Sequence, residues 1–342
     1  MRRDPLTYAD AGVDIGEADV ALERMRPLLE STYGPGVVSK TGTFAALFVP
    51  EQFPDQVLTA TIDGVGTKAK VAPHHTVGGD IVRHCGNDTI CQGASPLFFL
   101  DYVGSGTLSV EMAEGLTRGM ADTCREIGCL TIPIIGGETA QMPDTYQGDA
   151  YDLVGCMIGM VGRSCLITGE GIQPGNVVIG FPSVGIHTNG YSLARKVIFE
   201  IEGLSVGSEI PGLGISVGEE LSKPHRSYLK AIQMLQGKVV IRGIAHITGG
   251  GLPDNIRRIL PEACRAVIRR ETWDALPIFA HIQKAGGVED REMFRVFNMG
   301  IGMVLAIERE DQDQALELLQ IHNETPIVIG EIVQGERGVE IV

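Results

Sequence analysis

The apolar residues of the chain fall into short runs that alternate with helix-like patterns. Short runs of branched aliphatic and aromatic residues are typical of buried strands. Strands are therefore predicted at Val57–Ile62, Leu97–Leu100, Ile132–Ile135, Val177–Gly180 and Ile301–Ile307. Helical patterns lie between these runs, and the first is a helix near Glu17–Glu30. This alternation predicts an α/β or α+β fold.

The clearest helical pattern begins after Ser109, a residue type that caps helix N-termini well. Glu111 and Glu114 stand near its first turn, where acidic side chains favour the helix dipole. Gly128 is a natural stop. One face of this helix is predicted to be apolar, and it comprises Ala113, Leu116, Met120, Cys124 and Ile127.

A glycine-rich stretch in the middle of the chain predicts a domain boundary. The segment Val161–Asn176 reads VGRSCLITGEGIQPGN and is rich in turn formers. A chain of 342 residues is long enough for two domains with a core in each. We therefore predict a first domain over residues 1–164 and a second over residues 165–342, the latter including a helix at Asp254–Leu260.

The charge of the chain limits its partners. Lys and Arg number 28 against 43 Asp and Glu, so the formal net charge is −15, and both halves are acidic. There is no basic stripe to neutralise a nucleic-acid backbone. A phosphorylated small molecule would have to be bound locally, by backbone N–H groups, a few cations or a metal ion.

Other features of the composition favour a cytoplasmic protein. The seven cysteines include no CxxC pair, which predicts reduced thiols. The N-terminus has no apolar segment of the kind found in signal peptides. No apolar run approaches the roughly 18 residues of a membrane span, so no membrane partner is expected.

The commonest catalytic motifs are missing, and acidic residues stand out instead. The sequence has no GxxxxGK[ST], GxGxxG, GxSxG or HExxH. Asp63 follows the apolar run TATI, Glu138 follows IPIIGG, and the stretch GGDIVRHCGND contains Asp80 and Asp88. Clustered carboxylates at strand ends suit Mg²⁺, which prefers hard oxygen ligands. Turn formation or helix capping is the alternative for such acids, and Lys68 offers a point charge for a phosphoryl group.

The stretch AHITGGGLPDNI predicts an anion site. Gly249, Gly250 and Gly251 precede a helix whose start is marked by Pro253. Successive N–H groups of such a loop converge on an anion at a helix N-terminus, and a tight turn is the alternative. His246, on the preceding strand, is of a kind more often packed or hydrogen-bonded than catalytic.

Two more polar loops carry candidate site residues. In SVGIHTNGYSLARK, His187 and Asn189 either orient a ligand amide or carboxyl group or cap the helix that follows. In GGETAQMPDTY, Glu138 is placed to reach into a cleft. The residues alone thus indicate an enzyme that binds a magnesium nucleotide and a phosphorylated small molecule.

At these motifs the sequence resembles the aminoimidazole ribonucleotide synthetase family, also called phosphoribosylformylglycinamidine cyclo-ligases. The resemblance spans nearly the whole chain in the family's order. It rests on YADAGVDI (Tyr8–Ile15), DGVGTK (Asp63–Lys68), ND with QGASPLFFLDY (Asn87–Tyr102), GGETAQMP (Gly136–Pro143), HTNGYSLARK (His187–Lys196), AHITGGGLPDNI (Ala245–Ile256) and MFRVFNMGIGMVLAI (Met293–Ile307).

The resemblance implies an ATP- and Mg²⁺-dependent ring closure of formylglycinamidine ribonucleotide. ATP phosphorylates the formamide oxygen, the ribose-bearing nitrogen attacks the activated carbon, and phosphate leaves. The catalytic candidates are Lys68, Glu138, His187 and His246. The nucleotide- and substrate-binding candidates are Asp63, Gly64, Gly66, Thr67, Asp88, Gly136, Gly137, Asn189, Thr248, Gly249, Gly250 and Gly251. The candidate metal ligands are Asp63, Asp80, Asp88 and Glu138.

The resemblance also implies a homodimer in which the mixed N-terminal sheets form a barrel, and a C-terminal α/β sandwich that completes the site. The chain departs from the family in two places. The segment Lys40–Leu47, expected to cover the nucleotide, is poorer in glycine, and Gln141 and Asp144 stand where the family usually has Glu and Gly. The alternatives are an ATP-dependent phosphotransferase of the same superfamily and a non-catalytic nucleotide-binding dimeric module.

Overall fold

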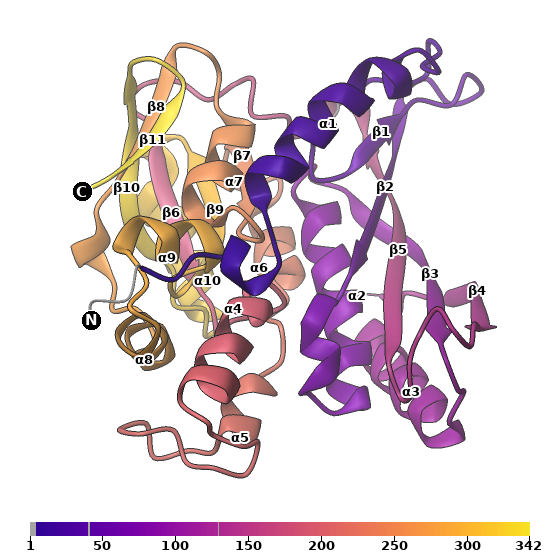
Figure 1. The fold of residues 1–342 in the computed structure, drawn as a ribbon. Coiled ribbons are helices and arrows are strands. Elements are labelled where there is room, and N and C mark those ends of the chain that lie inside the picture. Colours follow the sequence, from indigo (N-terminus) through magenta and orange to yellow (C-terminus); the bar gives the residue numbers. More distant parts are fainter. Residues whose placement is uncertain (1–4, 40–41, 129) are drawn as a thin grey trace.

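The computed structural model describes residues 5–39, 42–128 and 130–342. It has two lobes, each built on one β-sheet (Figure 1). The first sheet has the strand order β1-β2-β5-β3-β4 and the second the order β11-β8-β10-β6-β9-β7. Both sheets are mixed, since β3 pairs in parallel with β4, and β8 with β11, whereas the other neighbours are antiparallel. The predicted α/β fold with a mixed N-terminal sheet is confirmed.

The first lobe contains three helices and five strands within the described residues. They are α1 (Ile15–Glu30), α2 (His74–Ile90), α3 (Val110–Glu126), β1 (Ala46–Phe48), β2 (Gln56–Gly64), β3 (Ser95–Ser105), β4 (Ile134–Gln141) and β5 (Tyr151–Gly162).

The second lobe carries six strands and seven α-helices in the described part of the chain. The strands are β6 (Val177–Pro182), β7 (Ile241–His246), β8 (Cys264–Ile268), β9 (Ile301–Ile307), β10 (Ile327–Gln334) and β11 (Gly338–Ile341). The helices are α4 (Tyr191–Arg195), α5 (Val217–Leu221), α6 (Leu229–Leu235), α7 (Gly251–Ile259), α8 (Pro277–Gly286), α9 (Asp290–Val296) and α10 (Gln312–Ile321).

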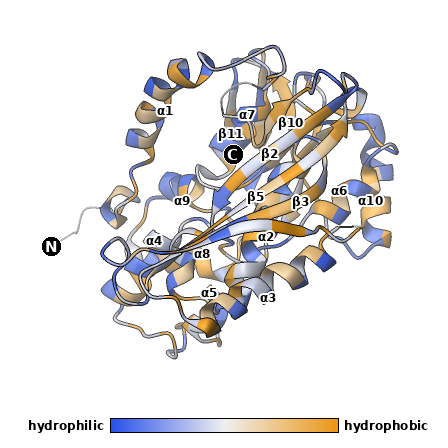
Figure 2. Cartoon of the chain, turned by 90° about the vertical axis from the view of Figure 1, so that its right-hand side faces the viewer, coloured by the Kyte–Doolittle hydropathy of each residue, from blue (hydrophilic) through white to orange (hydrophobic). Residues whose placement is uncertain are grey.

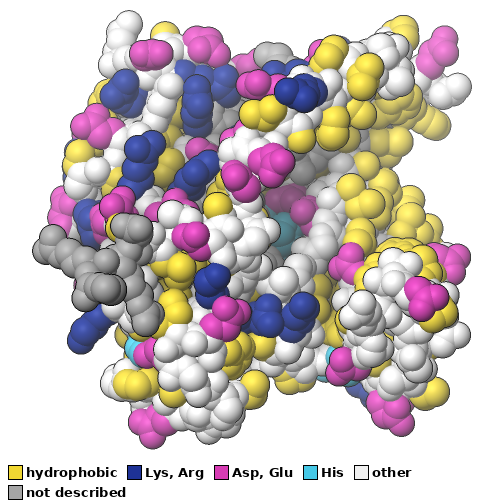
Figure 3. All heavy atoms as spheres, viewed as in Figure 1, with side chains coloured by type: hydrophobic (Ala, Val, Ile, Leu, Met, Phe, Trp, Pro, Cys, Tyr) yellow, Lys and Arg dark blue, Asp and Glu magenta, His cyan; other side chains and the backbone are white. Residues whose placement is uncertain are grey.

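One face of the first sheet packs on a helix and the other is open. The side chains of Val57 and Thr59 on β2 are fully buried on the face that α2 covers (Figure 1). The opposite face looks outward and carries apolar side chains (Figures 2 and 3). On it, Phe48, Leu58 and Met160 form one row across three strands, and Ile62 lies further along β2 with 69% exposure.

Most predicted elements are confirmed, with shifted ends. The helix after Ser109 is α3, and the Ser109 hydroxyl accepts a hydrogen bond from the backbone N–H of Met112. It ends at Glu126, before Gly128. Strand β4 begins two residues later than predicted, after Pro133.

Helix α7 begins earlier than predicted, at Gly251, so Pro253 is its third residue rather than its first. The whole of the predicted strand Ile301–Ile307 is β9, and it is buried along its length. No helix among the described residues is both long and apolar enough to cross a lipid bilayer.

Candidate active site

A cavity of about 470 Å³ lies where the two lobes meet. Figure 3 shows the hollow between the lobes, with acidic and histidine side chains at its floor. The residues that line it come from both lobes and include Thr43, Phe44, Thr61, Asp63, His84, Asp88, Asn189, Thr248, Gly249 and Arg258. The pocket therefore brings together Asp63, Asp88, Asn189, Thr248 and Gly249 of the predicted site.

Two carboxylates form the acidic wall of the pocket. Asp63 lies near the end of β2, and Asp88 lies on the last turn of α2. The Thr61 hydroxyl lies 3.3 Å from Asp63 Oδ2 and 3.5 Å from Asp88 Oδ2, so the two carboxylates are held close together. Burial raises the pKa of Asp88 well above its usual value, and the neighbouring charge of Asp63 adds to this shift. Such a pair is stabilised in its ionised form by a cation.

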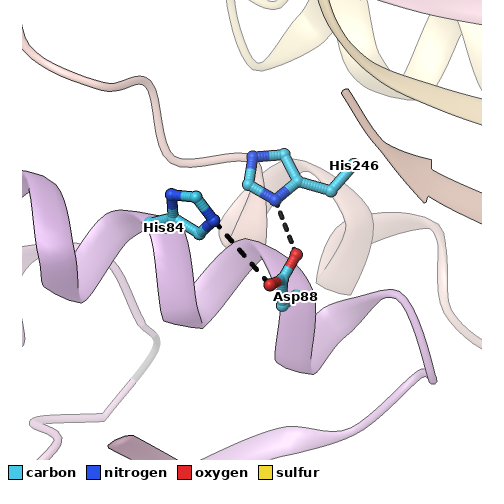
Figure 4. A group of neighbouring side chains, drawn as sticks. All are labelled: His84, Asp88 and His246. Carbon is cyan, nitrogen blue, oxygen red and sulfur yellow. Dashed lines mark hydrogen bonds and ion pairs between the residues drawn. The ribbon is translucent and has the colours of Figure 1, made fainter. Parts of the chain in front are cut away.

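Histidines from both lobes flank Asp88 (Figure 4). His84 precedes Asp88 by one turn of α2, and its Nε2 lies 3.9 Å from Asp88 Oδ2 and 3.6 Å from Asp63 Oδ1. His246, at the end of β7, places its Nδ1 2.7 Å from Asp88 Oδ1. Burial lowers the pKa of His246 to about 3, so this ring is neutral at physiological pH and orients Asp88 by a hydrogen bond.

A buried polar network continues from these histidines into the second lobe. Thr188 Oγ1 lies 2.8 Å from His84 Nδ1 and 3.2 Å from His225 Nδ1. His225 Nε2 in turn lies 3.0 Å from His246 Nε2. Burial lowers the pKa of His225 well below the usual value, with the neighbouring cationic forms adding to the shift. The network thus joins the lobes through buried imidazoles.

Lys68 does not lie in the pocket, which corrects its predicted contact with a phosphoryl group. Its side chain is fully buried, with Nζ 2.5 Å from Asp80 Oδ2 and 2.6 Å from the carbonyl oxygen of Lys223. Asp80 is fully buried as well, and its Oδ1 accepts a hydrogen bond from the backbone N–H of His225. The two residues neutralise each other, so Asp80 does not fit the role of a metal ligand. Their contacts with Lys223 and His225 hold this segment of the second lobe against the first lobe.

Glu138 also lies apart from the carboxylate pair within one chain. It sits on the edge strand β4 and is exposed, and β5 and β3 separate β4 from β2. Since neighbouring strands lie about 4.8 Å apart, Glu138 is about 14 Å from the strand of Asp63. Gly136 and Gly137 lie on the same edge strand. The structure therefore does not bring Glu138 and Asp63 of one chain together.

The triple-glycine loop lies at the pocket, but only part of it is free to bind an anion. The N–H of Gly251 donates to the carbonyl oxygen of Thr248 at 3.0 Å, so it closes a turn. The Asn255 amide donates to the carbonyl oxygens of Gly249 and Gly251, which fixes the loop. Gly249 lines the cavity. The loop is thus both a tight turn and a wall of the pocket.

Gly251→Ala is expected to destabilise the protein by about 2–4 kcal/mol. Its φ is +60°, and a Cβ there would lie 1.8 Å from the carbonyl oxygen of Phe294. Urea unfolding followed by circular dichroism measures the loss. Gly249→Ala is the matched control, because its φ is not positive and its nearest contact is 3.4 Å, to Asn189 Oδ1. Equal stability of the two variants would contradict the steric argument.

The other predicted residues lie around the pocket rather than in it. His187 is buried and stacks on His225 with ring centroids 4.2 Å apart, and neither of its ring nitrogens has a hydrogen-bond partner within the described residues. Gly66 and Thr67 begin a short 3₁₀ helix after Gly64, and Thr67 Oγ1 lies 3.2 Å from Ser192 Oγ. These residues pack behind the pocket and do not line it.

Sequence reasoning missed several residues of the pocket and of the buried network, among them Thr61, which lies between the two carboxylates. His84 and Arg258 line the cavity, and Arg258 also stacks over the ring of Phe44, 5.3 Å from its centroid. Thr188 and His225 link the rings of the buried network. The spacing of His84 four residues before Asp88 was the available signal, since such residues share a helix face. His225 carried no local signal.

Residues Thr43 and Phe44 of the expected covering segment line the cavity. Residues 40–41 of that segment lie outside the described residues. Asp144, which stands where glycine is usual in the family, has a φ of +75°, a conformation that glycine adopts most easily.

The fold and the pocket define a two-lobed protein in which a buried carboxylate, Asp88, and a partly exposed one, Asp63, line a pocket together with a glycine loop and an arginine. Two family profiles match the chain: "AIR synthase related protein, N-terminal domain" over residues 43–161 and "AIR synthase related protein, C-terminal domain" over residues 173–342. The phosphoribosylformylglycinamidine cyclo-ligases of Citrifermentans bemidjiense and Geotalea daltonii are 44% and 46% identical to it, each over 100% of this chain and 99% of the relative. The chain belongs to this family.

Solved structures with lower sequence identity share the fold. A HypE–HypF complex matches with a TM-score of 0.68 at 19% identity, covering 93% of this chain and 95% of that one. AaThiL complexed with AMPPCP and TMP matches with a TM-score of 0.63 at 15% identity, covering 94% of each chain. These similarities concern the fold alone.

Proposed function

We propose that the protein catalyses the ATP-dependent cyclisation of formylglycinamidine ribonucleotide to aminoimidazole ribonucleotide in purine biosynthesis, releasing ADP and phosphate. The observation that carries the proposal is the full-length similarity to cyclo-ligases, at 44–46% identity. The pocket between the lobes supports it, because it is large enough for polar ligands and holds the carboxylates that a metal nucleotide needs.

The donor set of the pocket fits a divalent cation. Asp63 and Asp88 offer carboxylate oxygens on neighbouring elements, and burial makes their mutual repulsion costly without a cation. Mg²⁺ held there would neutralise the phosphates of ATP and position them for transfer. His246 fixes the orientation of Asp88 through its Nδ1–H.

Other pocket residues are proposed to bind the anionic parts of the ligands. Arg258 offers a planar guanidinium, which suits phosphate oxygens. Thr248, Gly249 and Asn189 offer a hydroxyl, a backbone N–H and an amide on the opposite wall. Charge neutralisation and positioning are what phosphoryl transfer chiefly requires.

The reaction is tested by mass spectrometry of the purified protein incubated with Mg-ATP and formylglycinamidine ribonucleotide. We expect ADP and a nucleotide lighter by one water in equal amounts. ADP without the cyclised product would favour a phosphotransferase of the same superfamily. The absence of both products would favour the non-catalytic nucleotide-binding module.

We further propose that the protein is a cytoplasmic homodimer, paired through the open face of the first sheet. This face carries rows of apolar side chains, such as Phe48, Leu58 and Met160. Figure 2 shows the strands of this sheet in front, with no helix of the described residues covering them. A contiguous apolar sheet face of this kind is typical of a protein interface. A second copy would bury it on the same face, as a two-fold axis requires.

Ile62→Lys is expected to convert the dimer to a monomer. Ile62 is 69% exposed on this face, and a dimer would leave the new ammonium group buried among apolar side chains. Analytical ultracentrifugation gives the mass. Val110→Lys is the control, since Val110 is 75% exposed on α3 and away from the sheet face. An Ile62→Lys protein that stays dimeric would place the interface elsewhere.

A further inference from the structure

A buried histidine nitrogen points into the pocket without a hydrogen bond to any described residue. His84 is only 4% exposed, and its Nε2 faces Asp63 Oδ1 at 3.6 Å and Asp88 Oδ2 at 3.9 Å (Figure 4). These distances are too long for hydrogen bonds. With metal–ligand bonds of about 2.0–2.2 Å, two ligands of one ion lie about 3.0–3.5 Å apart. The contacts of 3.6 and 3.9 Å therefore have to shorten by about 0.1–0.9 Å for the three groups to share an ion.

The buried network engages the other nitrogen of His84. His84 Nδ1 lies 2.8 Å from Thr188 Oγ1, which lies 3.2 Å from His225 Nδ1. His225 Nε2 in turn lies 3.0 Å from His246 Nε2, and His246 Nδ1 lies 2.7 Å from Asp88 Oδ1. The contact at Nδ1 fixes the orientation of the His84 ring and leaves Nε2 facing the two carboxylates.

Asn87 also contacts the network. Asn87 Nδ2 donates one hydrogen to the carbonyl oxygen of Arg226 at 2.9 Å. It lies 3.1 Å from His225 Nε2 and 3.4 Å from His246 Nε2. Both nitrogens of His246 thus have polar partners, so of the two imidazoles beside Asp88 it is His84 that keeps a nitrogen without a hydrogen bond to a described residue.

We infer that His84 Nε2 is a third protein ligand of the cation held by Asp63 and Asp88, and that the site therefore prefers a first-row transition-metal dication such as Mn²⁺ over Mg²⁺. Ligand atoms of His84 and Asp88 lie within 4.8 Å of each other in a buried group that also includes His246, and Asp63 Oδ1 lies 3.6 Å from His84 Nε2. Mg²⁺ strongly prefers oxygen ligands, whereas imidazole favours transition metals. The inference rests on the cation site of the proposed function and is independent of the reaction.

The test is electron spin-echo envelope modulation of the full-length protein loaded with Mn²⁺ alone, without nucleotide. We expect modulation from a directly bonded imidazole ¹⁴N in the natural protein. In competition titrations, Mn²⁺ is expected to bind at least about tenfold more tightly than Mg²⁺. His84→Gln is expected to abolish the ¹⁴N signal and weaken Mn²⁺ binding about tenfold or more, with Mg²⁺ affinity changed less than about threefold.

His281→Gln is the matched control, because His281 also faces a carboxylate, Glu202, at 2.8 Å, but lies outside the pocket lining. It should keep the ¹⁴N signal. Bound Mn²⁺ without ¹⁴N modulation in the natural protein would overturn the inference, whatever the folding of the variants. Cyclisation with Mg-ATP would then still support the proposed function. Conversely, a ¹⁴N signal that depends on His84, in a protein that does not cyclise the substrate, would uphold the metal ligand alone.

Discussion

Asp63→Asn is expected to lower kcat/KM for cyclisation by about 10²–10³-fold, because it removes one charged ligand of the cation site. Asp63 faces the pocket from β2, and its carboxylate lies near Asp88 and His84. The amide keeps the shape of the side chain but not its charge. Steady-state kinetics with Mg-ATP and formylglycinamidine ribonucleotide measure the loss.

The same substitution is expected to leave the fold intact or slightly more stable. The charge of Asp63 is one cause of the raised pKa of Asp88, so its removal relieves a repulsion on the buried Asp88. Lost activity together with kept or increased stability is the pattern of a functional site. Asp122→Asn is the control. Asp122 lies on α3, outside the pocket lining, and forms surface ion pairs with His75 of α2 and Arg125 of α3. If Asp63→Asn turned over nearly as fast as this control, the cation assignment would be wrong.

The sequence predicted those features that depend on neighbours along the chain. The strand β9 and the cap at Ser109 follow from local periodicity and local hydrogen bonding, and both are confirmed. Asp63 stood out as an acid after an apolar run and Asp88 as an acid in the stretch GGDIVRHCGND, and the pocket does contain both. The resemblance to the cyclo-ligase family added the order of the motifs along the chain. It also added the role of these two acids in binding Mg-ATP.

Features that depend on contacts between distant segments could not be read from the sequence. Lys68 was predicted to contact a phosphoryl group because it ends the glycine-containing segment DGVGTK. In the structure its side chain is buried and donates to the backbone carbonyl oxygen of Lys223, which lies 155 residues away in the sequence. His225 became part of the site only through Thr188 and His246, which lie on other elements. The position of Glu138 could not be predicted without the strand order of the sheet, because that order puts its strand, β4, at the edge and away from β2.

The buried position of Lys68 has a large expected effect of its own. Lys68→Met removes the cation that faces Asp80, and both side chains are fully buried. A buried carboxylate left without its partner costs about 3–5 kcal/mol of folding free energy. The backbone N–H of His225 still donates to Asp80, and Arg83 Nη1 lies 3.8 Å from Asp80 Oδ1, but neither replaces the direct contact with the Lys68 ammonium group. Urea unfolding should therefore show a much lower midpoint for Lys68→Met.

The double variant Lys68→Met with Asp80→Asn separates this structural role from a role in catalysis. Neutralising Asp80 removes the stranded charge, so the double variant is expected to recover more than half of the lost stability. Lys70→Met is the matched control, because Lys70 is exposed on the same 3₁₀ helix and should change stability by less than about 0.5 kcal/mol. A Lys68 that instead bound a transferred phosphoryl group would show the opposite pattern, with normal unfolding and a reduced kcat in the single variant. The ion pair between Lys68 and Asp80 thus predicts that Lys68→Met lowers the stability of the fold and that Asp80→Asn restores much of it.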